Sequence, residues 1–459
     1  MKFERKTVMN AFQLCALAAA SAIVPMSATA GVSKAEAAKL GTAEVTWFGA
    51  DARANADGSI PAWTGGILGA QGTKDPAAYV ADKPLYSITA ANMAQHASKL
   101  TEGQKEILKR FPDYRIDVYP TRRTFSANQW IMDNTRKNAQ QCTTIDDGNG
   151  LDIKNCLGGV MFPLPQTGKE VMWNFLARVR PPNAWYARSR NWVVEKGHSP
   201  VMTGETETIA YSAFFDPQRT KETTLLAQIR VMSTGPARAA GEGILMYQHV
   251  TPEANPTQVW QYIPGQRRVR LAPELAFDTP SPNNGGLITV DQTDVFLGSP
   301  ERYQMKIVGK QEKLLLNNNH KLLFNKEACG SPKLLQPSFV NPECMRWELQ
   351  RVYVVEATVQ EGKRHLLPKR VFYIGEDGYQ SISSDDYDSG GKLYRTSFRP
   401  TFVPAEGGAV PYSMTLMYDF ARSAYVVEGL PNDFDGVQFV PPPNPRDLSP
   451  DALAATGVR

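Results

Sequence analysis

The clearest pattern along the chain is an alternation of apolar and polar residues over positions 345–359. Odd positions there are mostly apolar or aromatic, whereas even positions include Arg346, Glu348, Gln350 and Glu356. Successive side chains of a β-strand point to opposite faces, so this period of two predicts a strand with one apolar and one polar face. We expect the apolar face to line the interior and the charged face to meet solvent.

The same period recurs between residues 185 and 430 and predicts many further strands. Glycine-containing turns such as Pro264-Gly265 and Ser389-Gly390-Gly391 separate several of them. Many strands joined by short turns predict a mainly β fold with one large antiparallel sheet. The expected strands are 186–194, 208–215, 223–232, 244–251, 258–263, 268–271, 303–310, 345–359, 370–374, 379–383, 393–398, 413–420 and 424–428.

The two ends of the chain lack this alternation. Residues 31–160 are rich in turn residues, with expected helices at 33–40 and 89–110, and a further helix is expected at 168–176. We expect residues 31–160 to pack as an irregular, helix-containing segment on the sheet formed by residues 161–430. The tail, residues 431–459, contains Pro441-Pro442-Pro443 and is expected to be extended and partly disordered.

Residues 1–30 have the pattern of a secretory signal peptide. Basic residues near the start precede an apolar run over 11–24, and Ala28-Thr29-Ala30 forms a small-x-small cleavage site. The alternative is a membrane anchor, but the run is shorter than the ~20 residues that span a bilayer. Leu14 precedes Cys15 where a lipidated cysteine needs a small residue, so a lipoprotein is disfavoured. We expect export and cleavage after Ala30.

Amino-acid composition argues against one class of function and indicates the state of the cysteines. The chain has 50 Lys and Arg against 46 Asp and Glu, a formal charge of +4 that gives no electrostatic case for nucleic acid. The four cysteines beyond the signal allow three disulfide connectivities, and we favour Cys142 with Cys156 and Cys329 with Cys344 because each pair closes a turn-rich loop. A four-cysteine metal site is the rival reading, but neither pair has zinc-knuckle spacing.

Residues that carry out catalysis are hard to find in the sequence. The histidines are isolated, and neither an H-E-x-x-H nor a G-x-S-x-G motif occurs. Gly241-Glu242-Gly243 is typical of a hairpin turn rather than a dinucleotide site. Residues 146–152 and 432–436 resemble calcium loops but lack the closing glutamate, so solvated turns are favoured. We therefore expect no enzyme activity, no metal and no cofactor.

Two long segments resemble a known family. Residues 159–174, with Phe162-Pro163-Leu164-Pro165 and Trp173-Asn174, and residues 259–270, with Trp260-Gln261-Tyr262-Ile263-Pro264, resemble the signatures of the family of unknown function DUF1329. The second segment is also similar to periplasmic outer-membrane lipoprotein-sorting proteins. Met161 stands where the family usually has proline.

The resemblance implies a Gram-negative periplasmic protein with a half-barrel like that of LolA and LolB, whose open side is covered by helices. It also implies that the protein acts together with an export pump of the resistance-nodulation-division class and with an outer-membrane protein. A carrier for a lipid or other apolar ligand is the favoured function, and a non-transporting envelope scaffold or an unfamiliar hydrolase are the alternatives. The residues expected to line the cavity are Trp260, Tyr262, Trp347, Leu349, Tyr353 and Val355.

Overall fold

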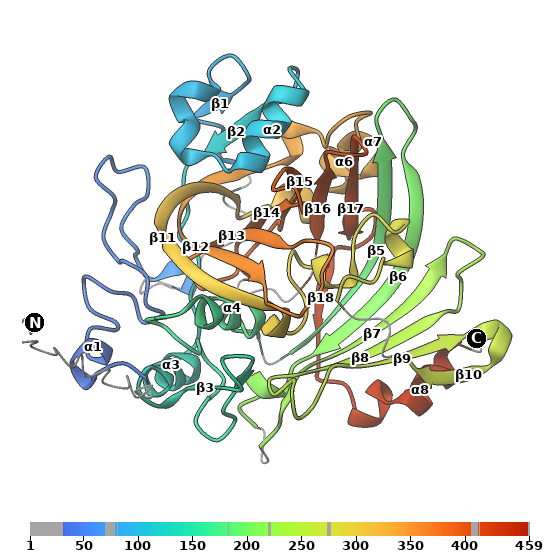
Figure 1. Ribbon diagram of the computed structural model, residues 1–459, viewed down its shortest axis with the longest axis horizontal. Helices are drawn as coiled ribbons and strands as arrows, with labels where there is room; N and C mark the ends of the chain where they lie inside the picture. The colour runs from blue at the N-terminus through green and yellow to red at the C-terminus, as the bar shows by residue number, and fades with distance from the viewer. Residues whose placement is uncertain are drawn as a thin grey trace, which may run out of the picture.

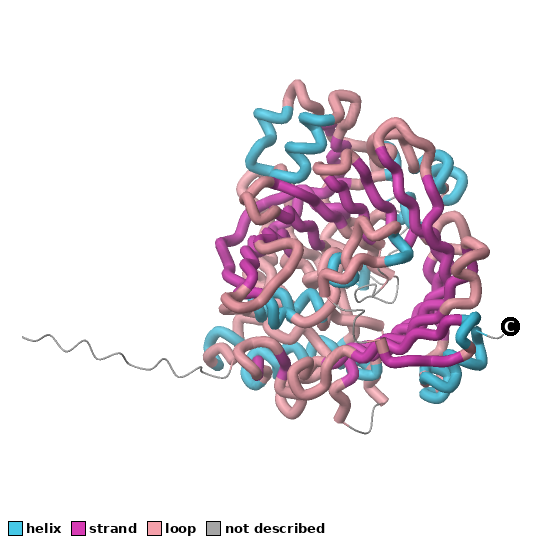
Figure 2. Tube along the Cα trace, turned by 45° about the vertical axis from the view of Figure 1, so that its right-hand side comes forward, coloured by secondary structure: helices cyan, strands magenta, loops and turns pink. Residues whose placement is uncertain are grey.

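The computed structural model describes residues 31–68, 79, 81–181, 183–218, 222–272, 277–404, 412 and 414–457. The expected signal peptide lies outside the described residues. Most described strands belong to one 16-stranded sheet, whose two end strands, β1 and β10, do not pair with each other. Its neighbours are antiparallel except where β2 meets β12. Figure 2 shows the strands following a wide arc around the interior.

The main path of the sheet joins distant parts of the chain. Its strands, in spatial order, are β1 (Tyr86–Ile88), β2 (Ile116–Tyr119), β12 (Trp347–Val359), β13 (Lys369–Gly375), β14 (Ile382–Tyr387), β15 (Leu393–Phe398), β16 (Thr415–Asp419), β17 (Ala424–Leu430), β5 (Ala184–Glu195), β6 (Val201–Tyr211), β7 (Leu225–Gly235), β8 (Gly243–His249), β9 (Gln258–Ile263) and β10 (Arg268–Leu271). Off this path, β11 (Tyr303–Leu316) pairs with β12, and β18 (Val437–Val440) pairs with β5. Figure 1 shows β11 and β12 as long, strongly curved strands. The predicted large antiparallel sheet is confirmed.

Helices lie at both ends of the chain and in one cluster within it. They are α1 (Lys34–Ala37), α2 (Glu102–Arg110), α3 (Gln129–Gln141), α4 (Gly168–Leu176), α5 (His320–Phe324), α6 (Lys326–Cys329), α7 (Ser331–Leu334) and α8 (Pro450–Gly457). A small second sheet pairs β3 (Thr144–Ile145) with β4 (Gly150–Leu151). The predicted helix at 168–176 is confirmed, whereas α3 and α5 to α7 were not predicted.

The single helix expected over 89–110 is instead two elements. A 3₁₀ segment ends at Lys99, and α2 begins after Thr101, whose hydroxyl accepts a hydrogen bond from Gln104 N. Asp385 from β14 accepts two further bonds, from Glu102 N at 2.9 Å and Gly103 N at 3.0 Å. These acceptors satisfy the free N–H groups at the start of a helix, so α2 starts here and is held against the sheet.

Two expected strands are displaced. The strand expected at 208–215 is β6, which begins at Val201 and ends at Tyr211 before a 3₁₀ turn at Ala213–Phe215. The sequence predicts a strand at 379–383, but β14 begins at Ile382 because the turn before it is longer. Gly378 and Tyr379 both take positive φ, at 74° and 56°, and cannot be part of an extended strand there.

The expectation of an extended, partly disordered tail was wrong. β18 pairs with β5, and α8 contacts β8, β9 and β10. Leu448 and Leu453 are buried against the sheet with Tyr262 and Leu245. Two apolar anchors in a polar, proline-rich segment are therefore enough to fix it on the outside of the sheet.

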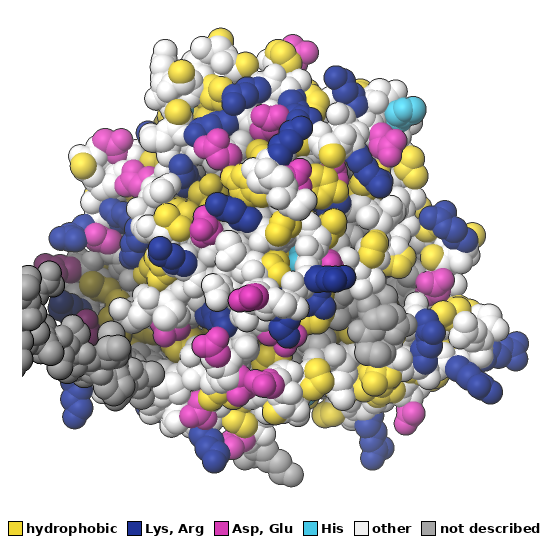
Figure 3. Space-filling model, in the orientation of Figure 1, with side chains coloured by type: hydrophobic (Ala, Val, Ile, Leu, Met, Phe, Trp, Pro, Cys, Tyr) yellow, Lys and Arg dark blue, Asp and Glu magenta, His cyan; other side chains and the backbone are white. Residues whose placement is uncertain are grey.

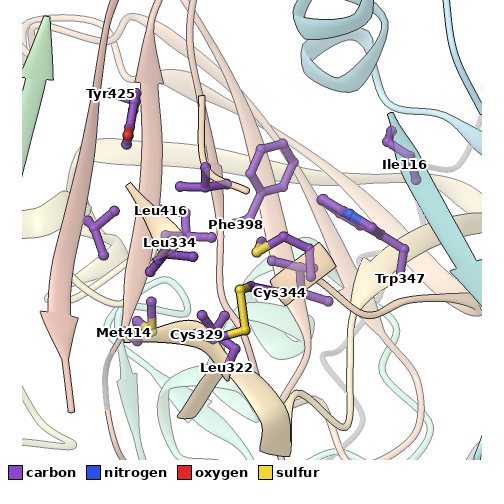
Figure 4. Packing of buried hydrophobic residues seen from close by; sticks show 14 of the residues in the cluster. Ile116, Leu322, Cys329, Leu334, Cys344, Trp347, Phe398, Met414, Leu416 and Tyr425 are labelled. Carbon is purple, nitrogen blue, oxygen red and sulfur yellow. A yellow bond between two sulfur atoms is a disulfide. The ribbon is translucent and has the colours of Figure 1, made fainter. Parts of the chain in front are cut away.

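Both predicted disulfides are confirmed. Cys142 is bonded to Cys156, and Cys329 is bonded to Cys344. Figure 4 shows the second bond within a core cluster that also contains Trp347 and Phe398. The disulfides therefore join the loops to two separate apolar cores, one for each pair.

Candidate functional site

A cavity of about 240 Å³ lies on the concave side of β5 to β9. Alternate side chains of each strand point into it, including Ile229 and Val231 from β7, Ile244 and Met246 from β8, and Val259 from β9. Cross-strand pairing places these side chains side by side, because Val231 lies opposite Ile244 and Met246 lies opposite Val259. The strands thus present an apolar wall to the cavity, and polar residues of the same strands, such as Thr208, Ser233 and Gln248, border it.

The intervening residues of the same strands point the other way. Met232, Leu245 and Tyr262 pack outside the sheet against Leu448 and Leu453 of the tail. Ile229, Val231, Ile244 and Met246, in contrast, are only partly buried. The outer face is covered by the tail around these three residues, and the inner face keeps apolar surface free to contact a ligand.

Opposite this wall the cavity has a cationic end. Arg178 and Arg180 follow α4 and line the cavity together with Asp294. Asp294 accepts a bond of 2.5 Å from Arg178 Nη2 and one of 2.5 Å from Arg399 Nε. Two guanidinium groups therefore share this carboxylate, and each of its oxygens is already bonded to an arginine.

Arg180 is the least satisfied member of this group. Its side chain donates to the carbonyl of Leu176 at 3.2 Å, and its buried Nε has no partner among the described residues. Burial lowers the pKa of Arg178 to about 9 and that of Arg180 to about 10, with Asp294 opposing the shift in both cases. Both side chains therefore remain cations at neutral pH.

A second carboxyl group, Glu428, also lines the cavity. Its Oε1 accepts bonds from Asn284 at 2.8 Å and Thr293 at 3.1 Å, whereas its buried Oε2 has no partner among the described residues. Burial raises the pKa of Glu428 above that of an ordinary glutamate. Its Oε1 is thus held by Asn284 and Thr293.

The buried His–Asp pair that the structure contains has no free nitrogen for catalysis. His365 Nε2 lies 2.8 Å from Asp291, and its Nδ1 accepts a bond from Leu367 N at 2.9 Å. A general base needs a free lone pair, so this pair serves to hold the loop that carries Asp291. Among the described residues, no group of three or more His, Cys, Asp or Glu side chains could hold a metal ion.

The predicted cavity residues lie elsewhere. Trp260 and Tyr262 are on the outer face of β9, and their neighbours Val259 and Gln261 line the cavity instead. The six predicted residues are absent from the cavity lining. Trp347 and Leu349 lie in one core cluster, and Tyr353 and Val355 lie in the other.

The expectation that the even face of residues 345–359 meets solvent was wrong for its first half. Glu348 is 0 % exposed and accepts a bond from Arg346 Nε at 2.6 Å and one from Asn318 Nδ2 at 3.0 Å. Buried partners replace water at this carboxylate, so the alternation does not reveal which face is solvated. Only near the end of the strand does Glu356 stay partly exposed.

The outer surface gives fewer indications of function. On the face in Figure 3, basic and acidic side chains are interspersed. Within the described residues, no helix combines the length and apolarity needed to cross a bilayer. The interior cavity is therefore the feature on which a function can be argued.

The fold is a curved, open sheet that surrounds a mainly apolar cavity. The chain belongs to the family described as "Protein of unknown function (DUF1329)", whose model matches residues 87–454. It is 34% identical over 444 residues to "Uncharacterized protein PA3922" of Pseudomonas aeruginosa, covering 94% of this chain and 95% of the relative. Membership predicted from the two sequence signatures is thus confirmed.

Solved structures with partial similarity are also known. A putative outer membrane lipoprotein-sorting protein domain from Vibrio parahaemolyticus has a TM-score of 0.41 and 13% identity, covering 62% of this chain and 97% of that one. A DUF1329 family protein from Desulfovibrio piger has a TM-score of 0.38 and 11% identity, covering 62% and 95%. The LolA superfamily protein NE2245 from Nitrosomonas europaea has a TM-score of 0.35 and 12% identity, covering 63% and 100%.

Proposed function

We propose that this protein is a periplasmic carrier that binds one hydrophobic ligand in the cavity between β5 and β9. The observation that carries the proposal is the row of partly exposed apolar side chains that line the cavity on the concave face. The cavity volume of about 240 Å³ is close to the lower end of small-molecule sites, which hold ~300–1,000 Å³. One acyl chain suits such a space better than a lipid with several chains.

Burial of such a chain gives tight binding without any covalent chemistry. Each methylene transferred from water contributes about 0.8 kcal/mol, so a chain of about twelve carbons gains close to 10 kcal/mol before the cost of ordering it. A carrier must also release its ligand, and binding through apolar contact alone leaves the ligand chemically unchanged. This favours a carrier over the hydrolase alternative.

Filling the cavity is expected to weaken the binding of an apolar ligand. Met246→Trp places an indole on the inner face, and we expect the affinity for a fluorescent fatty-acid probe to fall by roughly tenfold or more, because the chain loses its space. Leu271→Trp is the matched control, since Leu271 lies opposite Trp260 on the outer face and is 53 % exposed. Fluorescence titration measures both. Equal probe binding by the two variants, or no binding by the wild type, would reject the carrier proposal.

We also propose export to the periplasm, which rests on the signal-peptide pattern, and delivery to a pump and an outer-membrane partner, which rests on what the family resemblance implies. Intact-mass measurement of the protein recovered from the periplasm is expected to show a chain that begins at Gly31. A mass that still includes residues 1–30, or a lipid on Cys15, would contradict the export proposal.

A further inference from the structure

We infer that the cavity recognises a single-chain amphiphile with an anionic head, a carboxylate or a phosphate, and that Arg180 binds that head. This inference rests on the proposed carrier function and adds the class of ligand. It starts from the guanidinium group that the protein itself leaves unsatisfied. The apolar wall then accounts for the remainder of the ligand.

The arrangement of charges is the first argument. Arg178 and Arg399 take up both oxygens of Asp294, and Arg180 forms no ion pair within the described part of the chain. Burying a cation without a partner is costly, and the cost is offset when an anion arrives with the ligand. Arg180 lines the cavity, is 9 % exposed and has an unpartnered Nε. The missing partner is thus a negative group that enters the cavity.

The chemistry of guanidinium defines the head. Its planar N–H groups match two oxygens of one carboxylate or phosphate, which a hydroxyl or an amine cannot imitate. Glu428 and Glu242 also line the cavity and are the groups that could favour a cation instead. One oxygen of Glu428 already accepts hydrogen bonds from Asn284 and Thr293, and the cationic probe below tests whether its carboxylate prefers a cation.

The position of the apolar wall defines the tail. Ile229, Val231, Ile244 and Met246 line the same cavity as Arg180 but carry no charge. A ligand with its head at Arg180 therefore places its chain along β7 and β8. The volume of about 240 Å³ leaves room for one such chain.

Four probes with the same alkyl chain test the inference about the head group separately from the proposed carrier function. Dodecanoate, dodecyl phosphate, dodecanol and dodecyltrimethylammonium are titrated into the wild-type protein by calorimetry or by displacement of a fluorescent probe. We expect one or both anions to bind roughly tenfold or more tightly than dodecanol, with the cation weakest, because a charge-assisted bond is added only for the anions. A preference between the two anions identifies the source of the head group.

The role of Arg180 is tested by a substitution of similar length. Arg180→Met is expected to reduce anion affinity by roughly tenfold while changing dodecanol affinity by less than about twofold. Arg180→Lys is expected to restore part of the anion affinity. Arg230→Met is the control, because Arg230 lies on β7 between two inward residues but donates to the carbonyl of Asp447 on the outside.

The outcomes are distinguishable. Equal affinity of wild type for anions and dodecanol, or tightest binding of the cation, overturns the inference and leaves the carrier in place. No binding of any probe overturns both. Retention of anion preference by Arg180→Met overturns the assignment to Arg180, and thermal melting of each variant establishes that it is folded.

Discussion

Replacing Trp347 with alanine is expected to lower the free energy of unfolding by about 3–5 kcal/mol. Trp347 is 1 % exposed and packs edge to face on Phe398, with ring centroids 5.2 Å apart. Figure 4 shows it in the close-packed cluster around the disulfide Cys329–Cys344. Truncation leaves a void among side chains that the fixed sheet and disulfide hold in place, so the lost contacts are not regained.

Denaturant unfolding of wild type and variant measures this change. Leu366→Ala is the control, because Leu366 is 47 % exposed and its truncation is expected to change stability by less than about 0.5 kcal/mol. Folded Trp347→Ala is expected to bind dodecyl probes with unchanged affinity, since Trp347 does not line the cavity. A small loss of stability combined with a large loss of binding would instead place Trp347 next to the ligand.

The sequence predicted the strands well because alternation is a local property. The strands at 258–263, 268–271 and 393–398 begin and end where the pattern places them. Alternation separates two faces, but it does not tell which of them is inside a cavity. That depends on what covers the other face, and for β9 the cover is the tail that was expected to be disordered.

The choice between Trp260 and Val259 illustrates the point. Large aromatic side chains suggested a ligand wall, yet Trp260 and Tyr262 pack beneath the tail, and the smaller Val259 and Gln261 face the cavity. Trp185 and Tyr412, in contrast, do line the cavity, so aromatic residues alone do not distinguish core from site. The charged end of the cavity was missed as well. The only local signal was Arg178-Val179-Arg180 directly after a predicted helix.

The second large effect is expected at Asp294, the carboxylate shared by buried arginines. Asp294→Asn is expected to lower the free energy of unfolding by about 3–5 kcal/mol, because it removes the negative charge that pairs with both Arg178 and Arg399. Asparagine keeps the shape of the side chain and tolerates the φ of 58° at this position, so the change tests the charge rather than the backbone.

Glu356→Gln provides the matched control for this prediction. Glu356 forms an ion pair of 2.7 Å with Lys369, but both side chains are more than a third exposed, and such pairs contribute about 0–1 kcal/mol. Denaturant unfolding at neutral pH compares the two variants with the wild type. A loss below about 1 kcal/mol for Asp294→Asn would mean that water or another group already compensates the arginines.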